Sequence, residues 1–398
     1  MRRKLLAGAV AALFALTSCA QPTGSDTAEG GERTTYKIGV LLPRSGTYAT
    51  VGRQNEAGVE LAVGEINSTG FLGEGKTLEV DVQDTGGEPA RAIGVANRWT
   101  QQSDVLGVAC CVFTNEAAAV APVLPESGMA MVLNGSISKE PLKQPNVFRG
   151  FPLVQAGDTE VTQAALKAFS PKTAAVVFTQ DNEGMVDAKN NVVGVLEQAG
   201  VKVESVGTQA ADTSFAGPAT QVADAKPDLT VVLLLGNANG QMIKELRDRG
   251  HEGPIVADTV ASAKDVYNVG GDALVGSLMA IAFDPNSANA PTKNFIERWR
   301  AKFPDREPDQ VGAIGYMSVW LLARAIKQSG GADRKAVADG LAKVGTVETP
   351  MGLLDYSVGQ EPKKTDPFSL VQWSAEGGGT IVPWDGTAAG VQSRKASG

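Results

Sequence analysis

Short apolar runs alternate with amphipathic segments along most of this chain. Residues 38–42 form the first such run, and a turn bounded by glycines follows at 45–52. Beyond the turn, Leu61, Ala62 and Ile66 share one face of a 3.6-residue period. Because a continuous apolar run is typical of a strand covered on both faces, the pattern predicts a strand, a turn and a helix of a parallel sheet. Ligands bind beyond the carboxyl ends of such strands, so 45–52 is the first candidate for a ligand-facing loop, with an ordinary turn between strand and helix as the alternative.

The alternation continues in two sets of segments. The first set predicts strands at 78–84, 105–111 and 130–134 and helices at 89–102 and 115–126. The second set predicts strands at 174–179, 201–208, 229–236 and 254–259 and helices at 154–169, 184–199, 214–225 and 239–249. A strand at 276–283, helices at 292–303 and 310–328 and a strand at 368–373 follow. Regular alternation of strands and helices predicts an α/β fold with doubly wound parallel sheets, one for each set.

The first residues have the pattern of an export signal. Cationic residues at 2–4 precede an apolar stretch at 5–16 that is too short for a permanent membrane span. The stretch ends in Leu-Thr-Ser-Cys, which resembles the bacterial lipobox and implies a signal peptide at 1–18 and lipid attachment at Cys19. Cleavage near Ala20 with release of a soluble product is the alternative. Residues 19–35 are polar and are expected to form a flexible tether.

The composition of the chain makes several classes of function unexpected. The chain has 36 Lys+Arg against 44 Asp+Glu, and loss of the leader makes its net charge of −8 more negative by three, so nucleic acid is not an expected partner. His251 is the single histidine and follows Gly250 at a predicted helix end, where a solvated turn residue is expected. With so few histidines and thiols, neither a His/Cys metal site nor a histidine-based triad is expected. The chain is therefore predicted not to be an enzyme and to need no cofactor.

Cys110 and Cys111 are adjacent, and export would make a disulfide possible. Neighbouring Cα atoms across a trans peptide lie about 3.8 Å apart, which is closer than the usual disulfide separation. Two buried thiols are therefore expected at the end of the strand, with a vicinal disulfide as the alternative.

Short motifs in a fixed order carry a resemblance to a known family. They are Ile38-Gly39-Val40, Ser45-Gly46, Gly52, Gly58, Ile66-Asn67, Gly70-Phe71-Leu72-Gly73, Asp84, Pro89, Ala92, Thr114, Ala119-Val120-Ala121-Pro122, Val147-Phe148-Arg149, Ser214-Phe215, Pro227-Asp228, Phe368 and Gln372-Trp373. Together they resemble the bacterial periplasmic substrate-binding proteins of the leucine/isoleucine/valine-binding type, the receptors of branched-chain amino-acid ABC transporters. The resemblance implies two doubly wound lobes that are joined by a three-crossing hinge and close over a ligand.

The resemblance also implies boundaries for the lobes. The chain is expected to cross between them near Phe151, near Phe283 and again at 351–356. Lobe 1 is then 36–152 plus 283–350, and lobe 2 is 153–282 plus 351–385. The remaining residues, 386–398, are expected to form a flexible tail.

Four candidate ligand contacts lie in lobe 1. Thr114 stands where the family has a serine whose hydroxyl and backbone N–H hold the ligand carboxylate, although a simple N-cap is the other interpretation. Ser136 and Ser138 follow the predicted strand at 130–134, near the family's second hydroxyl contact, and Ile137 could take that place instead. Tyr48, in the opening turn, is expected to cover the ligand or to pack at the edge of the lobe.

Three candidates lie in lobe 2, and they are more polar than the family pattern. Glu183 stands where many members have an aromatic residue, and its carboxylate could pair with an ammonium or be a solvated loop acid. Asp258 lies close to the family acid that accepts from the ligand amine, and Asn237 is a weaker candidate. An aliphatic ligand needs an apolar pocket, so the expected ligand is an amino acid of branched-chain or more polar type.

These features together predict an exported binding lipoprotein that faces the periplasm or the cell exterior. Its expected partners are a small-molecule ligand, the permease subunits of an ABC transporter, and the membrane through the lipid anchor. Two alternatives are open: a ligand-sensing receptor, and a binding protein for a non-amino-acid molecule such as an amide, urea or aromatic carboxylate.

Overall fold

The first sheet has five parallel strands in the order β2-β1-β3-β4-β5. The computed structural model describes residues 34–46, 49–153 and 155–393. The strands are β1 (Thr35–Leu42), β2 (Thr77–Asp84), β3 (Val105–Ala109), β4 (Ala130–Leu133) and β5 (Val147–Arg149). All residues of β3 and β4 are buried, which confirms that their continuous apolar sequences belong to strands covered on both faces.

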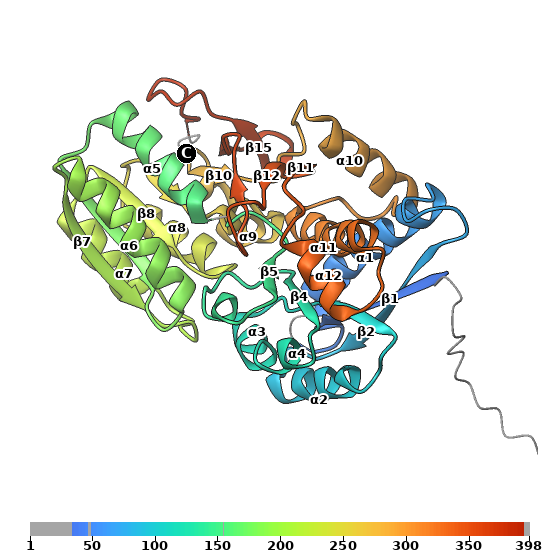
Figure 1. The fold of residues 1–398 in the computed structure, drawn as a ribbon. Helices are drawn as coiled ribbons and strands as arrows, with labels where there is room; N and C mark the ends of the chain where they lie inside the picture. Colours follow the sequence, from blue (N-terminus) through green and yellow to red (C-terminus); the bar gives the residue numbers. More distant parts are fainter. Residues whose placement is uncertain (1–33, 47–48, 154, 394–398) are drawn as a thin grey trace, which may run out of the picture. The chain divides into compact units, whose positions relative to one another are not determined.

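Helices cover both faces of this sheet (Figure 1). One face carries α1 (Ala49–Ser68), α11 (Gln310–Ser329) and α12 (Arg334–Leu341). The other carries α2 (Pro89–Thr100), α3 (Thr114–Val120) and α4 (Val123–Glu126). Helices α1 and α11 approach so closely that a Cβ on Gly58 would lie 1.9 Å from the Gly312 carbonyl oxygen. Glycine at 58 therefore permits direct contact between the two helix backbones.

The second sheet has seven strands in the order β15-β14-β10-β9-β8-β6-β7. They are β6 (Thr173–Thr179), β7 (Lys202–Thr208), β8 (Leu229–Leu233), β9 (Ile255–Ala257), β10 (Leu278–Ile281), β14 (Ser369–Ser374) and β15 (Thr380–Pro383). Strands β6 to β10 pair in parallel, whereas β14 and β15 add an antiparallel edge. Such an edge is common in doubly wound sheets, but the alternation of strands and helices does not predict it.

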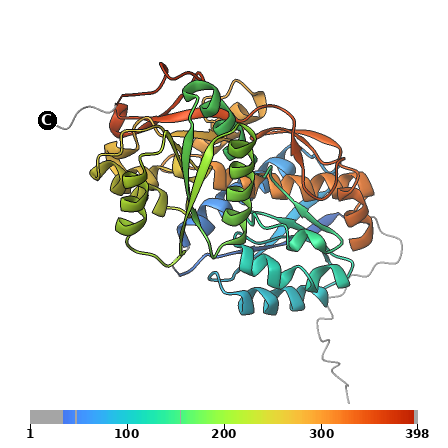
Figure 2. The ribbon, with the colours of Figure 1, turned by 90° about the vertical axis from the view of Figure 1, so that its left-hand side faces the viewer.

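Helices also flank the second sheet on both faces (Figure 2). One face carries α5 (Gln155–Phe169) and α6 (Glu183–Gln198). The other carries α7 (Ala216–Ala225), α8 (Ala238–Asp248) and α9 (Lys264–Gly270). The remaining helices are α10 (Ala290–Lys302), which contacts α1, and the short 3-10 helices η1 (Pro141–Lys143), η2 (Thr259–Ser262), η3 (Gly271–Leu274) and η4 (Glu376–Gly378).

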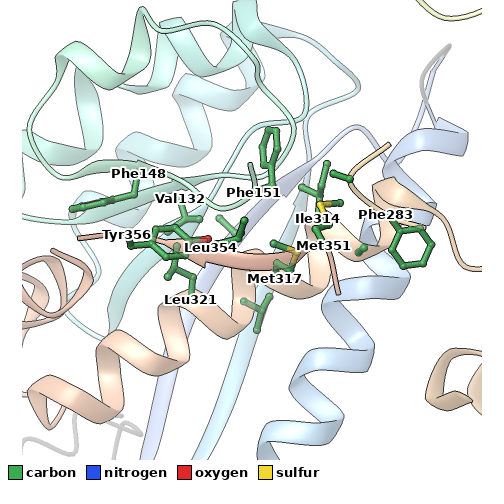
Figure 3. Packing of buried hydrophobic residues seen from close by; sticks show 14 of the residues in the cluster. Val132, Phe148, Phe151, Phe283, Ile314, Met317, Leu321, Met351, Leu354 and Tyr356 are labelled. Atoms are coloured by element: carbon green, nitrogen blue, oxygen red, sulfur yellow. The ribbon is translucent and has the colours of Figure 1, made fainter. Parts of the chain in front are cut away.

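The chain passes between the two sheets three times, after β5, after β10 and before β14. The third passage includes the antiparallel strands β11 (Thr346–Thr349), β12 (Gly352–Asp355) and β13 (Lys363–Lys364). Tyr356 donates to the Gly150 carbonyl at 3.1 Å, and Thr292 donates to the Pro350 carbonyl at 3.0 Å. Apolar side chains from the three passages pack together with α11 in one buried cluster (Figure 3). The fold is thus two doubly wound units joined by a three-crossing hinge.

Some elements differ from the predictions. The helix expected at 115–126 is divided into α3 and α4 around Pro122, which has no N–H to continue the hydrogen-bond ladder. Helix α1 begins at Ala49, inside the expected turn. Strand β5, strands β11 to β13, strand β15 and helices α9 and α12 were not predicted.

Two residue-level expectations are wrong. His251 is only 6% exposed, and its Nε2 lies 3.0 Å from the Thr230 hydroxyl under the second sheet, so it is not a solvated turn residue. Cys110 and Cys111 form a vicinal disulfide rather than two thiols. The argument for thiols assumed a trans peptide, whereas the peptide bond is cis and the Cα atoms are 3.1 Å apart.

The segment after Trp384 contacts the second sheet. The Gln372 side chain donates to the Gly390 carbonyl at 2.7 Å and accepts from the Gln392 N–H at 2.7 Å. These two bonds attach part of the segment that was expected to be flexible. Across the described ranges, every helix is too short or too polar to span a bilayer.

Candidate ligand-binding site

The turn that follows β1 is held by Asp84, at the end of the neighbouring strand. Its carboxylate accepts hydrogen bonds from the N–H groups of Arg44 at 2.8 Å and Gly86 at 2.9 Å, and from the Ser45 hydroxyl at 2.5 Å. Burial acts to raise the pKa of Asp84, but these hydrogen bonds outweigh it and lower the pKa. The start of the turn predicted from the sequence is therefore attached to the end of β2 through Ser45. Tyr48 lies outside the described residues.

Thr114 and Ser136 lie together at the carboxyl ends of β3 and β4. Thr114 is the first residue of α3, and its Oγ1 is 3.4 Å from the Ser136 Oγ. The Ser136 N–H donates to the Cys111 carbonyl at 3.0 Å, which fixes the start of the loop. The N-cap position of α3 is occupied by Phe113, so capping does not account for Thr114. Two hydroxyls from neighbouring strand ends thus lie within hydrogen-bonding distance of each other.

Ser138 and Glu183 join the loop after β4 to the start of α6. The Ser138 hydroxyl donates to Glu183 Oε2 at 2.7 Å and accepts from the Glu140 N–H at 3.0 Å. A Cβ on Gly184 would lie 2.5 Å from the Ile137 Cδ1 atom, so this helix start fits against the loop only because residue 184 has no side chain. Strand-end loops of the first and second sheets therefore meet at this point.

Arg149 supports this loop and was not predicted as a site residue. Its side chain is fully buried, and its guanidinium donates to all three carbonyl oxygens of 136–138, with distances of 3.3 Å to Ile137 and 3.0 Å to Ser138. Its Nε donates to Glu361 at 2.9 Å. Burial lowers the pKa of Arg149, and the Glu361 carboxylate opposes this effect. One buried cation thus positions the backbone that carries Ser138.

Asn237 and Asp258 lie at the matching edge of the second sheet, but their side chains have different surroundings. Asn237 is exposed and precedes α8 without capping it. The nearby Asn239 is buried, and its amide accepts from and donates to the backbone of Leu234. Asp258 is fully buried, and its Oδ1 accepts from the Val260 N–H at 2.8 Å. Within the described chain, no hydrogen bond joins either residue to the four predicted residues that cluster at the loop.

Asp258 instead pairs with Asp158 of α5, and both carboxyl groups are buried completely. Burial raises the pKa of Asp258 to about 6. Burial, followed by the charge of Asp258, raises the pKa of Asp158 further above its ordinary value. Because the two buried carboxyl groups interact, the raised pKa belongs to the pair and not to either residue alone. Sequence reasoning could not have found this pair, because the two acids come from distant segments.

The arrangement offers hydroxyl donors, one exposed carboxylate and a buried acid pair at the facing strand ends. Such groups can orient a small polar molecule by hydrogen bonding. Among residues 34–46, 49–153 and 155–393, no three His, Cys, Asp or Glu side chains gather in a way that could hold a metal ion.

Comparison with known proteins gives one family over most of the chain. A family model described as periplasmic binding protein matches residues 35–379. The leucine-, isoleucine-, valine-, threonine-, and alanine-binding protein of Pseudomonas aeruginosa is 24% identical over 356 residues, which cover 87% of this chain and 92% of that protein.

Solved structures share the fold. The branched-chain amino acid transporter substrate binding protein of Streptococcus pneumoniae, in complex with isoleucine, has a TM-score of 0.74 at 22% identity and covers 88% of this chain and 99% of its own. A solute binding protein of an ABC transporter from Rhodopseudomonas palustris, in complex with 3,4-dihydroxy benzoic acid, has a TM-score of 0.74 at 21% identity. The match covers 88% of this chain and 96% of that protein. These proteins bind substrates and are not enzymes. With its two doubly wound units, three crossings and a family match across 35–379, this chain belongs to the periplasmic binding protein family.

Proposed function

We propose that this protein is the exported substrate-binding component of an ABC importer and that it captures a small carboxylate-bearing molecule for delivery to a permease. The observation that carries the proposal is the meeting of strand-end loops from both sheets, with Thr114 and Ser136 on one side and Glu183 on the other. Lobe 1, at 36–152 plus 283–350, and lobe 2, at 153–282 plus 351–385, would close over the ligand. Closure would create the form that a permease distinguishes.

An amino acid is the ligand that this arrangement favours. The Thr114 and Ser136 hydroxyls would donate to its carboxylate, and the exposed Glu183 carboxylate would accept from its ammonium. Asp258 would contribute from the edge of the second sheet, where its carboxyl is fully buried beside that of Asp158. Asn237 and Tyr48 would complete the lining. The relative from Pseudomonas aeruginosa, named for five amino acids, supports this ligand class.

An aromatic carboxylate is the second candidate ligand. The Rhodopseudomonas palustris structure with 3,4-dihydroxy benzoic acid supports it, because that protein shares the fold. Such a ligand would use the same hydroxyl pair through its carboxylate and would not need Glu183, since it has no ammonium.

A thermal-shift screen of the chain without its leader, against amino acids, aromatic carboxylates, short amides and urea, tests the proposal. A ligand at 100 times its dissociation constant adds about 2.7 kcal/mol of stability, which raises the melting temperature measurably. Glu183→Gln separates the two ligand classes. It should weaken the binding of an amino acid and leave the binding of an aromatic carboxylate unchanged. Failure of every compound in the screen to raise the melting temperature would contradict the proposed ligand class.

A further inference from the structure

A second cavity, of about 450 Å³, lies beside helix α11. Its walls come from the end of α1, from α10, from α11 and from the segment 346–350 that leads into the third crossing. None of the candidate ligand-binding residues lines it. Met317, Leu321 and Tyr356 contribute to this cavity and also to the buried cluster at the crossings (Figure 3). The cavity is therefore a separate feature on the hinge side of the first sheet.

Arg324 supplies the cationic group of this cavity. Its guanidinium lies over the rings of Trp320 at 5.7 Å and Phe71 at 5.9 Å. Contacts with ring faces do not occupy the N–H groups, so the guanidinium can also donate hydrogen bonds to a planar anion. Burial lowers the pKa of Arg324, with the nearby tyrosines opposing. In the described part of the chain, no carboxylate forms an ion pair with it.

The acids that line the cavity do not neutralise this cation. Glu65 accepts from the Tyr316 hydroxyl at 2.5 Å and pairs with Arg298, so its charge is already matched. Glu348 is exposed at the mouth, where water screens its charge. The acids that line the cavity therefore leave the positive charge of Arg324 unneutralised.

The remaining walls are of mixed character. The rings of Tyr316 and Trp320 have centroids 6.1 Å apart and are tilted by 53°, and Pro291, Val347 and Pro350 line the cavity together with the polar residues Asn294, Thr346 and Thr349. Two aromatic rings beside one guanidinium suit a planar aromatic body that ends in a carboxylate, because the body can pack against the rings while both carboxylate oxygens accept hydrogen bonds from the guanidinium.

We propose that this cavity is a second binding site, separate from the strand-end site, for a small organic carboxylate with a flat aromatic body. Arg324 binds the carboxylate, and the rings of Trp320 and Tyr316 hold the body. The assignment does not depend on which molecule the strand-end site takes.

Fluorine NMR of the purified protein labelled with 5-fluorotryptophan tests the proposal, with benzoate as the probe and the neutral isostere benzamide as its control. Trp320 is the tryptophan that lines the cavity, while Trp99, Trp299, Trp373 and Trp384 are each at most 4% exposed and serve as internal references. Trp320→Phe assigns the reporter signal. Benzoate should shift this signal in a saturable way, and benzamide should not.

Variants at the two sites decide where benzoate binds. Arg324→Met should weaken the benzoate response at Trp320 at least tenfold, whereas Arg324→Lys should weaken it less because the charge is kept. Thr114→Val should leave the response unchanged. The proposal fails if Trp320 does not respond, if benzamide acts like benzoate, if folded Arg324→Met keeps its response, or if Thr114→Val removes it. Melting curves establish that each variant is folded.

Discussion

The hydroxyl of Thr114 can be tested without changing the shape of the side chain. Thr114→Val replaces the hydroxyl with a methyl group, so a bound carboxylate loses one donor. We expect a carboxylate ligand found in the screen to bind more weakly by about 1.5–3 kcal/mol, as for hydrogen bonds to charged groups. Thr114→Ser keeps the hydroxyl and should bind nearly as well as the parent. Isothermal titration measures both, and equal affinities for all three proteins would remove Thr114 from the site.

The buried acid pair predicts how stability depends on pH. Asp258 has a pKa of about 6 in the folded protein against 3.8 for a free side chain, so the folded state holds its proton more tightly than the unfolded state. The contribution of this group to the free energy of unfolding is fully present below about pH 4 and is lost as pH rises through 6. Asp258→Asn, which keeps an acceptor for the Val260 N–H, should remove about 1–3 kcal/mol of this loss.

Urea unfolding of both proteins between pH 4.5 and 7.5 measures the effect. The difference in stability between Asp258→Asn and the parent should shift in favour of the variant as pH rises. If the two pH profiles run parallel, the carboxyl of Asp258 does not have the raised pKa.

The location of a single residue could be predicted from the sequence where the residue directly follows the end of a strand. Thr114, Ser136, Ser138 and Glu183 all follow strand ends, and hydrogen bonds connect them in two pairs. Arg149 was not predictable as a support, because its partners are backbone carbonyls and an acid 212 residues further along the chain. Such partners leave no local mark on the sequence.

The loop at 136–138 depends on Arg149 as a unit. The Arg149 side chain is fully buried, and Arg149→Met would leave three carbonyl oxygens without their donor and the partly exposed Glu361 without its cation. We expect a loss of about 3–5 kcal/mol in the free energy of unfolding. Arg44→Met removes an exposed arginine from its pair with Glu56 and is the matched control, with an expected loss of at most about 1 kcal/mol. Equal losses in urea unfolding would mean that Arg149 does not support the loop.

The contact between α1 and α11 depends on the missing side chain at Gly58. Gly58→Ala would place a methyl group 1.9 Å from the Gly312 carbonyl oxygen and force the helices apart, which should cost about 1–3 kcal/mol. Gly64 lies in the same helix but is exposed, and its Cβ would meet nothing closer than 3.8 Å. Gly64→Ala should stabilise the protein by about 0.4–1 kcal/mol. Thermal unfolding should therefore show shifts of opposite sign, and shifts of the same sign would contradict the close contact.

Elements were predictable where apolar periodicity is strong. Most parallel strands have apolar runs, as β3 and β8 do, and these were recognised. Strands β2 and β7 were also recognised, although their sequences mix apolar and polar residues. Strand β5 was not recognised, because it has only three residues. Strands β11 to β13 were not recognised either. Strands β11 and β13 are short and polar, and each is held by pairing with β12, which lies between them. The antiparallel edge was missed for a related reason, since strand direction follows from the path of the chain through the hinge.

Membrane attachment is a property of the whole molecule and rests on the prediction at Cys19, which lies outside the described residues. Cys19→Ala removes the thiol that would receive the lipid, so the protein should move from the membrane fraction to the soluble fraction. Cell fractionation together with labelling by a radioactive fatty acid measures this change. Continued membrane retention of an unlabelled variant would contradict the lipid anchor.

Three chain segments join the two sheets, and hydrogen bonds connect neighbouring segments, as between Tyr356 and Gly150 and between Thr292 and Pro350. A single flexible linker would let two bodies twist and slide as well as bend. Three segments fastened side by side resist twisting and sliding, so bending is the one soft coordinate that remains. If the protein closes over its ligand as proposed, occupancy of the site would be expressed as a single angle, and a permease would sense it from the distance between two points on the surface.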